Sequence, residues 1–338
     1  MDLLEPGALG LHCAAGGFHV DPWGTAEHAV LTHAHGDHAR PGSRRYYCAA
    51  PGAALLRRRL GEDTPILEVP YGERLKLGGA TVSFHPSGHV LGAAQVRIEA
   101  DGQVWVVSGD YKRDADPTCA PFEVVPCDTF VTEATFALPV FRWPKTADVI
   151  AEIRDWWTEA RAGGRPAVLF AYALGKAPRI LAELRALTDE PVFTHGAVEA
   201  MVAVYRSLGI PMLETRPVPD KRAGGWLPGA LVLAPLSASG TPWMRRFPNA
   251  TTGFASGLMR IRGTRRRKGY DRGFVLSDHA DWPALLRTIE ETGARRVLVT
   301  HGYTHVLARY LREQGRTADV LATPYAGEAD LETPPETT

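Results

Sequence analysis

Cysteine is scarce in this chain of 338 residues, and its four cysteines (Cys13, Cys48, Cys119 and Cys127) form no CxxC pair. Neither a disulfide framework nor a cysteine zinc site is therefore indicated. No apolar run approaches the ~18 residues of a membrane span, and the first residues lack the basic and apolar regions of a signal peptide. We expect no membrane association and a reducing, cytoplasmic location.

Net charge is also absent, because 38 Lys and Arg residues balance 38 Asp and Glu residues. This excludes a bulk polycation such as a histone-like protein, but it allows a local basic face. Hydrophobic residues make up 45% and charged residues 22% of the chain. That composition is typical of a folded globular protein and excludes a wholly disordered one. The length allows two domains.

Short apolar segments alternate with amphipathic ones, which predicts an α/β protein. We expect strands at 29–32, 81–84, 104–107, 129–132, 167–170, 231–234, 273–276 and 297–300. We expect helices at 146–162, 176–188, 197–208, 281–292 and 305–314.

The strongest motif is HAHGDH at residues 33–38. In an extended backbone, side chains two residues apart share a face, so His33 and His35 can offer nitrogens to one metal ion. Gly36 permits a sharp turn, after which Asp37 and His38 can face a second ion. Imidazole and carboxylate ligands suit zinc, with manganese or iron as lesser options. The alternative is a polar loop whose histidines are unconnected.

Five further metal-type side chains lie at or just after the ends of expected strands: His89, Asp110, Glu133, His279 and His301. An α/β sheet collects its functional groups beyond the carboxyl ends of its strands. Any one of these residues could be an ordinary core or surface residue. Their recurrence at successive strand ends instead predicts a single site.

The chain resembles a known family at these positions. Six residues resemble the metal-binding motifs of the metallo-β-lactamase fold, namely His33, His35, Asp37, His38, His89 and Asp110. Asp21 resembles the upstream structural aspartate of that fold. Three more residues, Glu133, His279 and His301, resemble the signatures of its β-CASP branch, the nucleases of DNA repair and RNA maturation. The likeness spans roughly residues 10–325 and is most similar to the bacterial ligase-associated DNA exonucleases.

The resemblance implies a metallo-β-lactamase αββα sandwich with an inserted β-CASP α/β domain. The sandwich would comprise 1–142 and 273–327, the inserted domain 143–272, and a flexible tail 328–338.

The resemblance also implies two Zn²⁺ ions, with Mn²⁺ as a possible substitute. The expected ligands are His33, His35 and His89 for one ion, Asp37, His38 and His301 for the other, and Asp110 as the bridge. Asp37, Glu133 and His279 would be the catalytic residues, with His279 donating a proton to the leaving oxygen. The alternatives are a surface carboxylate for Glu133 and a helix-start histidine without a catalytic role for His279.

A basic stretch stands out against the neutral whole. Seven cations fall within thirteen residues, opposed only by Asp271: Arg260, Arg262, Arg265, Arg266, Arg267, Lys268 and Arg272. Such a stretch predicts sequence-independent contact with a phosphate backbone, and a solvated basic loop is the alternative. Lys176 opens an expected helix after a strand, where phosphate binds readily. Ser237 and Ser239, in a small-residue loop, predict either a close phosphate contact or a plain turn.

Together these features predict a zinc-dependent DNA exonuclease that hydrolyses phosphodiester bonds by a two-metal mechanism in DNA repair. The resemblance implies DNA as substrate and functional association with a DNA ligase and a helicase. An RNA-processing β-CASP ribonuclease is the alternative, since His301 matches the histidine typical of RNA-directed members. A small-molecule hydrolase of the same fold and a non-cutting nucleic-acid scaffold are the remaining readings.

Overall fold

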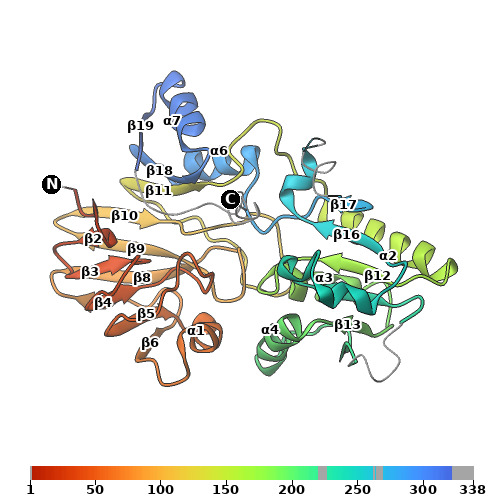
Figure 1. Cartoon of the computed structure of the whole chain (residues 1–338). Coiled ribbons are helices and arrows are strands. Elements are labelled where there is room, and N and C mark those ends of the chain that lie inside the picture. Colours follow the sequence, from red (N-terminus) through yellow and green to blue (C-terminus); the bar gives the residue numbers. More distant parts are fainter. Residues whose placement is uncertain (1, 220–226, 262, 264–268, 322–338) are drawn as a thin grey trace, which may run out of the picture. The chain divides into compact units, whose positions relative to one another are not determined.

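The structure is a computed structural model that describes residues 2–219, 227–261, 263 and 269–321 (Figure 1). The chain divides into two compact units. Unit 1 comprises Met1–Pro139 and His279–Thr338, and unit 2 comprises Val140–Asp278. The tail expected at 328–338 lies outside the described residues.

Unit 1 contains two sheets. The first has the strand order β1-β2-β3-β4-β5-β6. Its strands are β1 (Glu5–Gly7), β2 (Gly10–Cys13), β3 (Phe18–Val20), β4 (His28–Val30), β5 (Arg45–Ala49) and β6 (Ile66–Val69). The second has the order β19-β18-β11-β10-β9-β8-β7. Its strands are β7 (Leu75–Leu77), β8 (Ala80–Pro86), β9 (Ala94–Ala100), β10 (Gln103–Val107), β11 (Thr129–Ala134), β18 (Arg296–Gly302) and β19 (Thr317–Val320).

The core of unit 1 lies between these sheets, because buried side chains of both sheets belong to one apolar cluster. Val30 and Tyr47 come from the first sheet, and Val96 and Trp105 from the second. Along a strand, successive side chains point to opposite faces. Val106, the neighbour of Trp105, accordingly belongs to a different cluster, in which the second sheet packs against helices.

Two helices pack on the outer face of the second sheet of unit 1, and a third lies beside an edge strand of the first sheet. The helices α6 (Trp282–Glu291) and α7 (Thr304–Glu313) contribute Leu285 and Leu311 to the cluster on the outer face of the second sheet. Asp281 starts α6 by accepting a hydrogen bond from the backbone N–H of Ala284 at 3.0 Å, as N-cap residues do. The short η1 (Ala50–Gly52) and the helix α1 (Ala53–Leu60) follow β5, and α1 contacts β6 (Figure 1).

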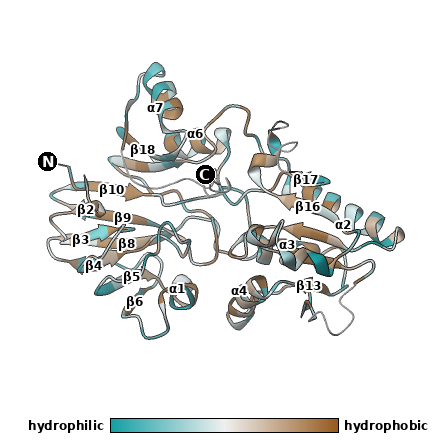
Figure 2. Ribbon diagram, viewed as in Figure 1, coloured by the Kyte–Doolittle hydropathy of each residue, from teal (hydrophilic) through white to brown (hydrophobic). Residues whose placement is uncertain are grey.

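Unit 2 is built on one parallel sheet with the order β14-β13-β15-β12-β16-β17. Its strands are β12 (Ala167–Phe170), β13 (Val192–Thr194), β14 (Thr215–Pro217), β15 (Leu231–Ala234), β16 (Thr251–Ala255) and β17 (Arg272–Phe274). Its helices are α2 (Thr146–Ala162), α3 (Lys176–Leu184), α4 (Gly196–Ser207), η3 (Leu236–Ala238), η4 (Pro242–Arg246) and η5 (Gly257–Arg260). Hydrophobic and hydrophilic residues alternate along α2 (Figure 2), because only one of its faces joins the apolar core of unit 2.

The expected α/β class is confirmed, and each expected helix is present. The helix α2 occupies the expected 146–162, whereas α3 ends at Leu184 instead of 188. The expected boundary between 272 and 273 falls inside β17, which pairs with β16 in the sheet of unit 2. Several strands were not expected, and many of them are only three residues long, such as β13 and β14. Such short strands leave too few residues for a period of two to stand out.

No helix within the described residues is both long and apolar enough to cross a lipid bilayer.

Candidate metal centre

The loop that follows β4 carries the HAHGDH motif into the interior of unit 1. His33 and His38 are buried, while His35 and Asp37 are partly exposed. The expected turn at Gly36 is present, because the backbone N–H groups of His38 and Ala39 donate to the carbonyl oxygen of His35, although the φ of Gly36 is not positive. A Cβ atom at Gly36 would lie 2.9 Å from Nη1 of Arg59, so a larger residue there would displace that guanidinium.

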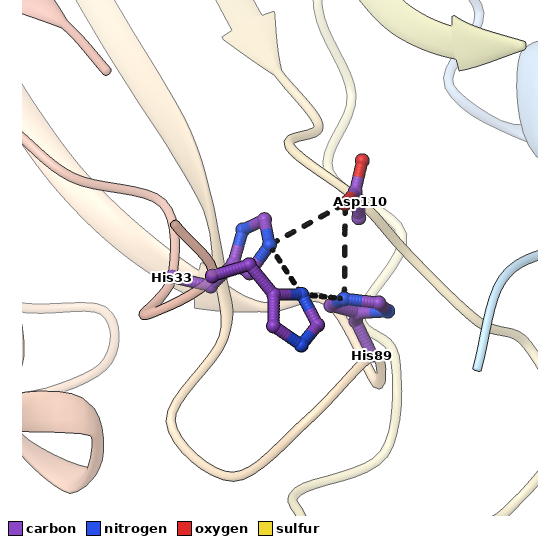
Figure 3. A group of neighbouring side chains, drawn as sticks. His33, His89 and Asp110 are labelled. Atoms are coloured by element: carbon purple, nitrogen blue, oxygen red, sulfur yellow. Dashed lines mark hydrogen bonds and ion pairs between the residues drawn. The ribbon is translucent and has the colours of Figure 1, made fainter. Parts of the chain in front are cut away.

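The first cluster joins this loop to the loops after β8 and β10. Nδ1 of His35 lies 3.0 Å from Nε2 of His33 and 3.0 Å from Nε2 of His89. Oδ2 of Asp110 lies 3.4 Å from the same nitrogen of His33 and 3.7 Å from that of His89. Figure 3 shows the side chains of His33, His89 and Asp110 pointing toward one another.

The second cluster shares Asp110 with the first. Ligand-type atoms of His38, Asp110 and His301 lie within 4.8 Å of one another, and Nε2 of His38 is 3.5 Å from Oδ2 of Asp110. The rings of His38 and His301 stack, with centroids 5.1 Å apart. Asp37 is adjacent, since its Oδ2 lies 3.7 Å from Nε2 of His38. The structure thus gathers six of the seven residues expected as metal ligands into two clusters, and it places the seventh, Asp37, next to His38.

The spacing of these atoms suits divalent metal ions. Ligands about 2.0–2.1 Å from a tetrahedral zinc ion lie about 3.3 Å from one another. The four separations given above for the first cluster are 3.0–3.7 Å, and all of its ligand-type atoms lie within 4.8 Å of one another. The other carboxylate oxygen of Asp110, Oδ1, is buried and makes no hydrogen bond to a described residue. Such an atom is costly unless a cation or a donor reaches it. The residues therefore fit two ions that share Asp110.

Burial keeps three of the histidines neutral. It lowers the pKa of His33 well below its ordinary value, and the nearby His38 lowers it further. Burial also lowers the pKa of His35 to about 3 and that of His301 to about 4. Because only neutral imidazole binds a metal ion, these three side chains are in the ligating form at neutral pH.

His38 and Asp110 attract each other strongly. Burial by itself lowers the pKa of His38, but the negative charges of Asp110 and Asp37 outweigh it and raise the pKa well above the ordinary value. Burial likewise raises the pKa of Asp110, but the positive charge of His38 outweighs it and holds that pKa well below the usual range. Without a metal ion, the negative charge of Asp110 is thus balanced by protonated His38. A bound cation would supply that positive charge in place of the proton.

Asp21 orients a histidine of the second cluster through a hydrogen bond. It is buried, and its Oδ2 accepts hydrogen bonds from Nδ1 of His38 at 2.8 Å and from the hydroxyl of Thr32 at 2.6 Å. Its Oδ1 accepts one from the backbone N–H of Thr32 at 2.8 Å. A partner on Nδ1 leaves Nε2 of His38 as the nitrogen available to a metal. Asp21 also has a φ of 44°, which aspartate tolerates better than most residues.

Two glycines permit the close approaches on which the clusters depend. Gly109, next to Asp110, has a φ of 55°, and a Cβ atom there would lie 2.7 Å from the Cβ of Thr32. Gly302, next to His301, has a φ of 69°, and a Cβ atom there would lie 2.5 Å from the carbonyl oxygen of Ala134. A larger residue at either position would push a ligand loop outward.

Glu133 and His279 form a pair beside the clusters. Nδ1 of His279 lies 3.0 and 3.1 Å from the two carboxylate oxygens of Glu133, and the backbone N–H of Tyr111 donates to Oε1 at 2.8 Å. Glu133 is fully buried, so the alternative of a surface carboxylate is wrong. Ligand-type atoms of Asp110, Glu133 and His279 lie within 4.8 Å of one another.

The residues expected to bind nucleic acid differ in their exposure and in their hydrogen bonds. Arg260 is exposed, and its Nε donates to the carbonyl oxygen of Val140 at 3.3 Å. Ser237 is exposed, whereas the hydroxyl of Ser239 accepts a hydrogen bond from Tyr270 at 3.1 Å. Five expected contacts lie outside the described residues, namely Arg262, Arg265, Arg266, Arg267 and Lys268.

Lys176 differs from its expected role as a phosphate contact. It is fully buried, with Nζ 3.7 Å from Oδ2 of Asp278 and 4.7 Å from the ring centroid of Tyr172. Arg179, one helical turn later, is also fully buried and lies 3.5 Å from Oδ1 of Asp278. A lysine enclosed in this way neutralises a buried carboxylate, so it is not available at the surface for a phosphate.

Sequence reasoning missed two contacts in unit 1. Thr32 bridges Asp21 and the motif through its backbone and its hydroxyl; its position directly before His33 was the available signal. Arg59 of α1 donates from Nε to the carbonyl oxygen of Ala34. In the sequence, Arg59 is one of three successive arginines, Arg57 to Arg59. The sequence alone does not indicate which of the three faces the motif.

Comparisons with known proteins relate the chain to several enzymes, although no family model matches it. It is 31% identical over 315 residues to a protein of Opitutus terrae named "Probable DNA ligase", covering 91% of this chain and 30% of that protein. It is 26% identical over 145 residues to an "RNase J-like protein" of Methanocaldococcus jannaschii, covering 40% of this chain and 34% of that protein. It is 30% identical over 115 residues to "Endoribonuclease YSH1" of Eremothecium gossypii, covering 33% and 15%.

The chain therefore spans about a third or less of the length of these relatives. Among solved structures, it is similar in fold to a protein of unknown function from Enterococcus faecalis, with a TM-score of 0.55 and 14% identity over 89% of this chain and 78% of that one. The chain is thus an α/β protein with two clusters of metal-binding type, similar in sequence to proteins named as nucleases and as a DNA ligase.

Proposed function

We propose that this chain is a zinc-dependent DNA exonuclease of the metallo-β-lactamase fold, β-CASP branch. The observation that carries the proposal is the convergence of six metal-type side chains on two clusters that share Asp110, with Asp37 beside the second cluster. Two cations about 3.5–4 Å apart are the arrangement that hydrolyses phosphodiesters by in-line displacement. Unit 1 would be the metallo-β-lactamase domain and unit 2 the inserted β-CASP domain.

The residues have separate tasks in this proposal. His33, His35 and His89 would hold one ion, Asp37, His38 and His301 would hold the other, and Asp110 would serve both. When bound, the two ions supply positive charge to the scissile phosphate and make water acidic enough to attack near neutral pH.

The Glu133–His279 pair serves the leaving group. The carboxylate accepts the Nδ1 proton of His279, which fixes the ring orientation and leaves Nε2 to exchange a proton. An imidazole titrates near neutral pH, so it is suited to protonating a leaving 3′-oxygen. The product then carries a 5′-phosphate.

DNA is the proposed substrate because the similarity that extends over 315 residues is to a protein named as a DNA ligase. A ligase needs clean ends, and an exonuclease can trim ends before joining, so we place the activity in DNA repair beside a ligase and a helicase in the cytoplasm. The second candidate is an RNA-processing ribonuclease, which the similarity to RNase J-like and YSH1 proteins supports, as does the presence of His301.

One assay series separates the candidates. End-labelled single-stranded DNA, duplex DNA and RNA of one sequence are incubated with protein loaded with zinc or with manganese. The proposal expects shortening of DNA from an end. Cutting of RNA alone would assign the ribonuclease instead.

The matched variants are Asp37→Ala, which removes an expected ligand, and Asp114→Ala, an exposed aspartate outside both clusters. Asp37→Ala is expected to abolish cutting, whereas Asp114→Ala is expected to retain it. Full activity of Asp37→Ala would refute the metal assignment.

A further inference from the structure

Arg59 of α1 places a cationic group against the metal-binding loop. Its Nε donates to the carbonyl oxygen of Ala34, the residue between His33 and His35. Its Nη1 approaches Gly36 so closely that a Cβ atom there would lie only 2.9 Å away. The guanidinium therefore lies over the segment that carries the ligands of both clusters.

The donors of Arg59 are only partly used. Within the described part of the chain, only Nε makes a hydrogen bond, so the N–H groups on Nη1 and Nη2 remain available. The side chain is exposed, and the guanidinium stays charged at all working pH values. Its neighbour Arg57 differs, since it pairs with Glu68 at 2.6 Å.

The charge of Asp37 acts on Arg59. Although the residue is exposed overall, desolvation of the guanidinium lowers the pKa of Arg59, and the negative charge of Asp37 opposes that shift without cancelling it. A planar guanidinium anchored through Nε presents its two remaining nitrogens as a fork, which matches two oxygens of a phosphate.

We propose that Arg59 binds a backbone phosphate of the DNA next to the scissile one, and so aligns the strand on the metal centre. This inference rests on the proposed nuclease function. Arg58 provides the matched control, because it has the same charge, is exposed on the same helix and makes no hydrogen bond or ion pair to a described residue.

The test measures binding separately from cutting. A fluorescein-labelled single-stranded 20-mer is titrated with protein in EDTA, from 50 to 200 mM KCl, and bound DNA is followed by anisotropy. Arg59→Ala is expected to weaken binding about tenfold and to reduce the slope of log K against log salt by about 0.7. Arg58→Ala is expected to stay within about twofold of the unmodified protein.

Two further readouts separate substrate binding from support of the loop. With zinc present, Arg59→Ala is expected to raise KM with little change in kcat, and its zinc content by mass spectrometry is expected to match the unmodified protein. Arg59→Lys, which keeps the charge, is expected to recover part of the salt slope. Equal effects of the Arg59→Ala and Arg58→Ala variants, or loss of zinc from Arg59→Ala, would overturn the inference. Absence of DNA cutting by the unmodified protein would instead overturn the proposed function.

Discussion

Replacement of Asp21 by asparagine tests how the second cluster is built. Oδ2 of Asp21 now accepts two hydrogen bonds, from Nδ1 of His38 at 2.8 Å and from the hydroxyl of Thr32 at 2.6 Å. Asparagine keeps the shape and tolerates the φ of 44°. One of its two heteroatoms, however, is an NH₂ group that cannot accept either bond. With the amide oxygen on the Thr32 N–H, His38 must accept at Nδ1 and carry its proton on Nε2.

A protonated Nε2 cannot bind a metal ion, so Asp21→Asn is expected to weaken one of two zinc sites. Loss of such a supporting partner typically costs 10- to 100-fold in metal affinity, and about 1–3 kcal/mol of stability for a buried group left unsatisfied. Metal-free protein is titrated with zinc against a chromogenic chelator. Asp128→Asn is the control, because that aspartate accepts from Val104 N–H at 2.9 Å and from Arg295 at 2.6 Å, outside both clusters. Two zinc sites of undiminished affinity in Asp21→Asn would refute the reasoning.

Three other changes have defined outcomes. Glu133→Gln leaves one acceptor oxygen, which the backbone N–H of Tyr111 occupies, and turns an NH₂ group toward Nδ1 of His279. The imidazole then loses the acceptor that orients it, so kcat is expected to fall about 10²- to 10⁴-fold at unchanged zinc content; a smaller loss would argue against His279 as the proton donor. Arg179→Ala leaves the buried Asp278 with one cation fewer and is expected to lower the free energy of unfolding by about 3–5 kcal/mol, measured by calorimetry of the full chain. Arg154→Ala, at a half-exposed arginine, is expected to lower it by less than about 1 kcal/mol. Equal losses in the two variants would refute this account. Burial raises the pKa of Cys48 to about 12, so its thiol is expected to resist iodoacetamide at pH 8 until urea unfolds the chain. Rapid labelling of Cys48 itself in the native protein, identified by peptide mass spectrometry, would contradict its burial.

The sequence by itself was enough to single out the metal-type side chains that the structure places close together. Ligand-type side chains are polar groups at the ends of apolar segments, and that local pattern can be read without a fold. The helix at 146–162 could also be predicted from the sequence. Because α2 buries only one face, its apolar residues recur with the helical period of about 3.6 residues. The spacing of His33, His35 and His38 was likewise a local pattern, and it predicted that their side chains could share metal sites.

Only the tertiary structure decided how these residues are supported. The contacts of Asp21 with His38 and of Arg59 with Ala34 join segments 17 and 25 residues apart, and nothing in either segment alone encodes the meeting. Lys176 shows the reverse, since a helix-start lysine looks available for phosphate until the fold encloses it beside Asp278. Periodicity and motifs are local properties of a chain, whereas burial and the partner of each charge depend on what long-range packing brings against it.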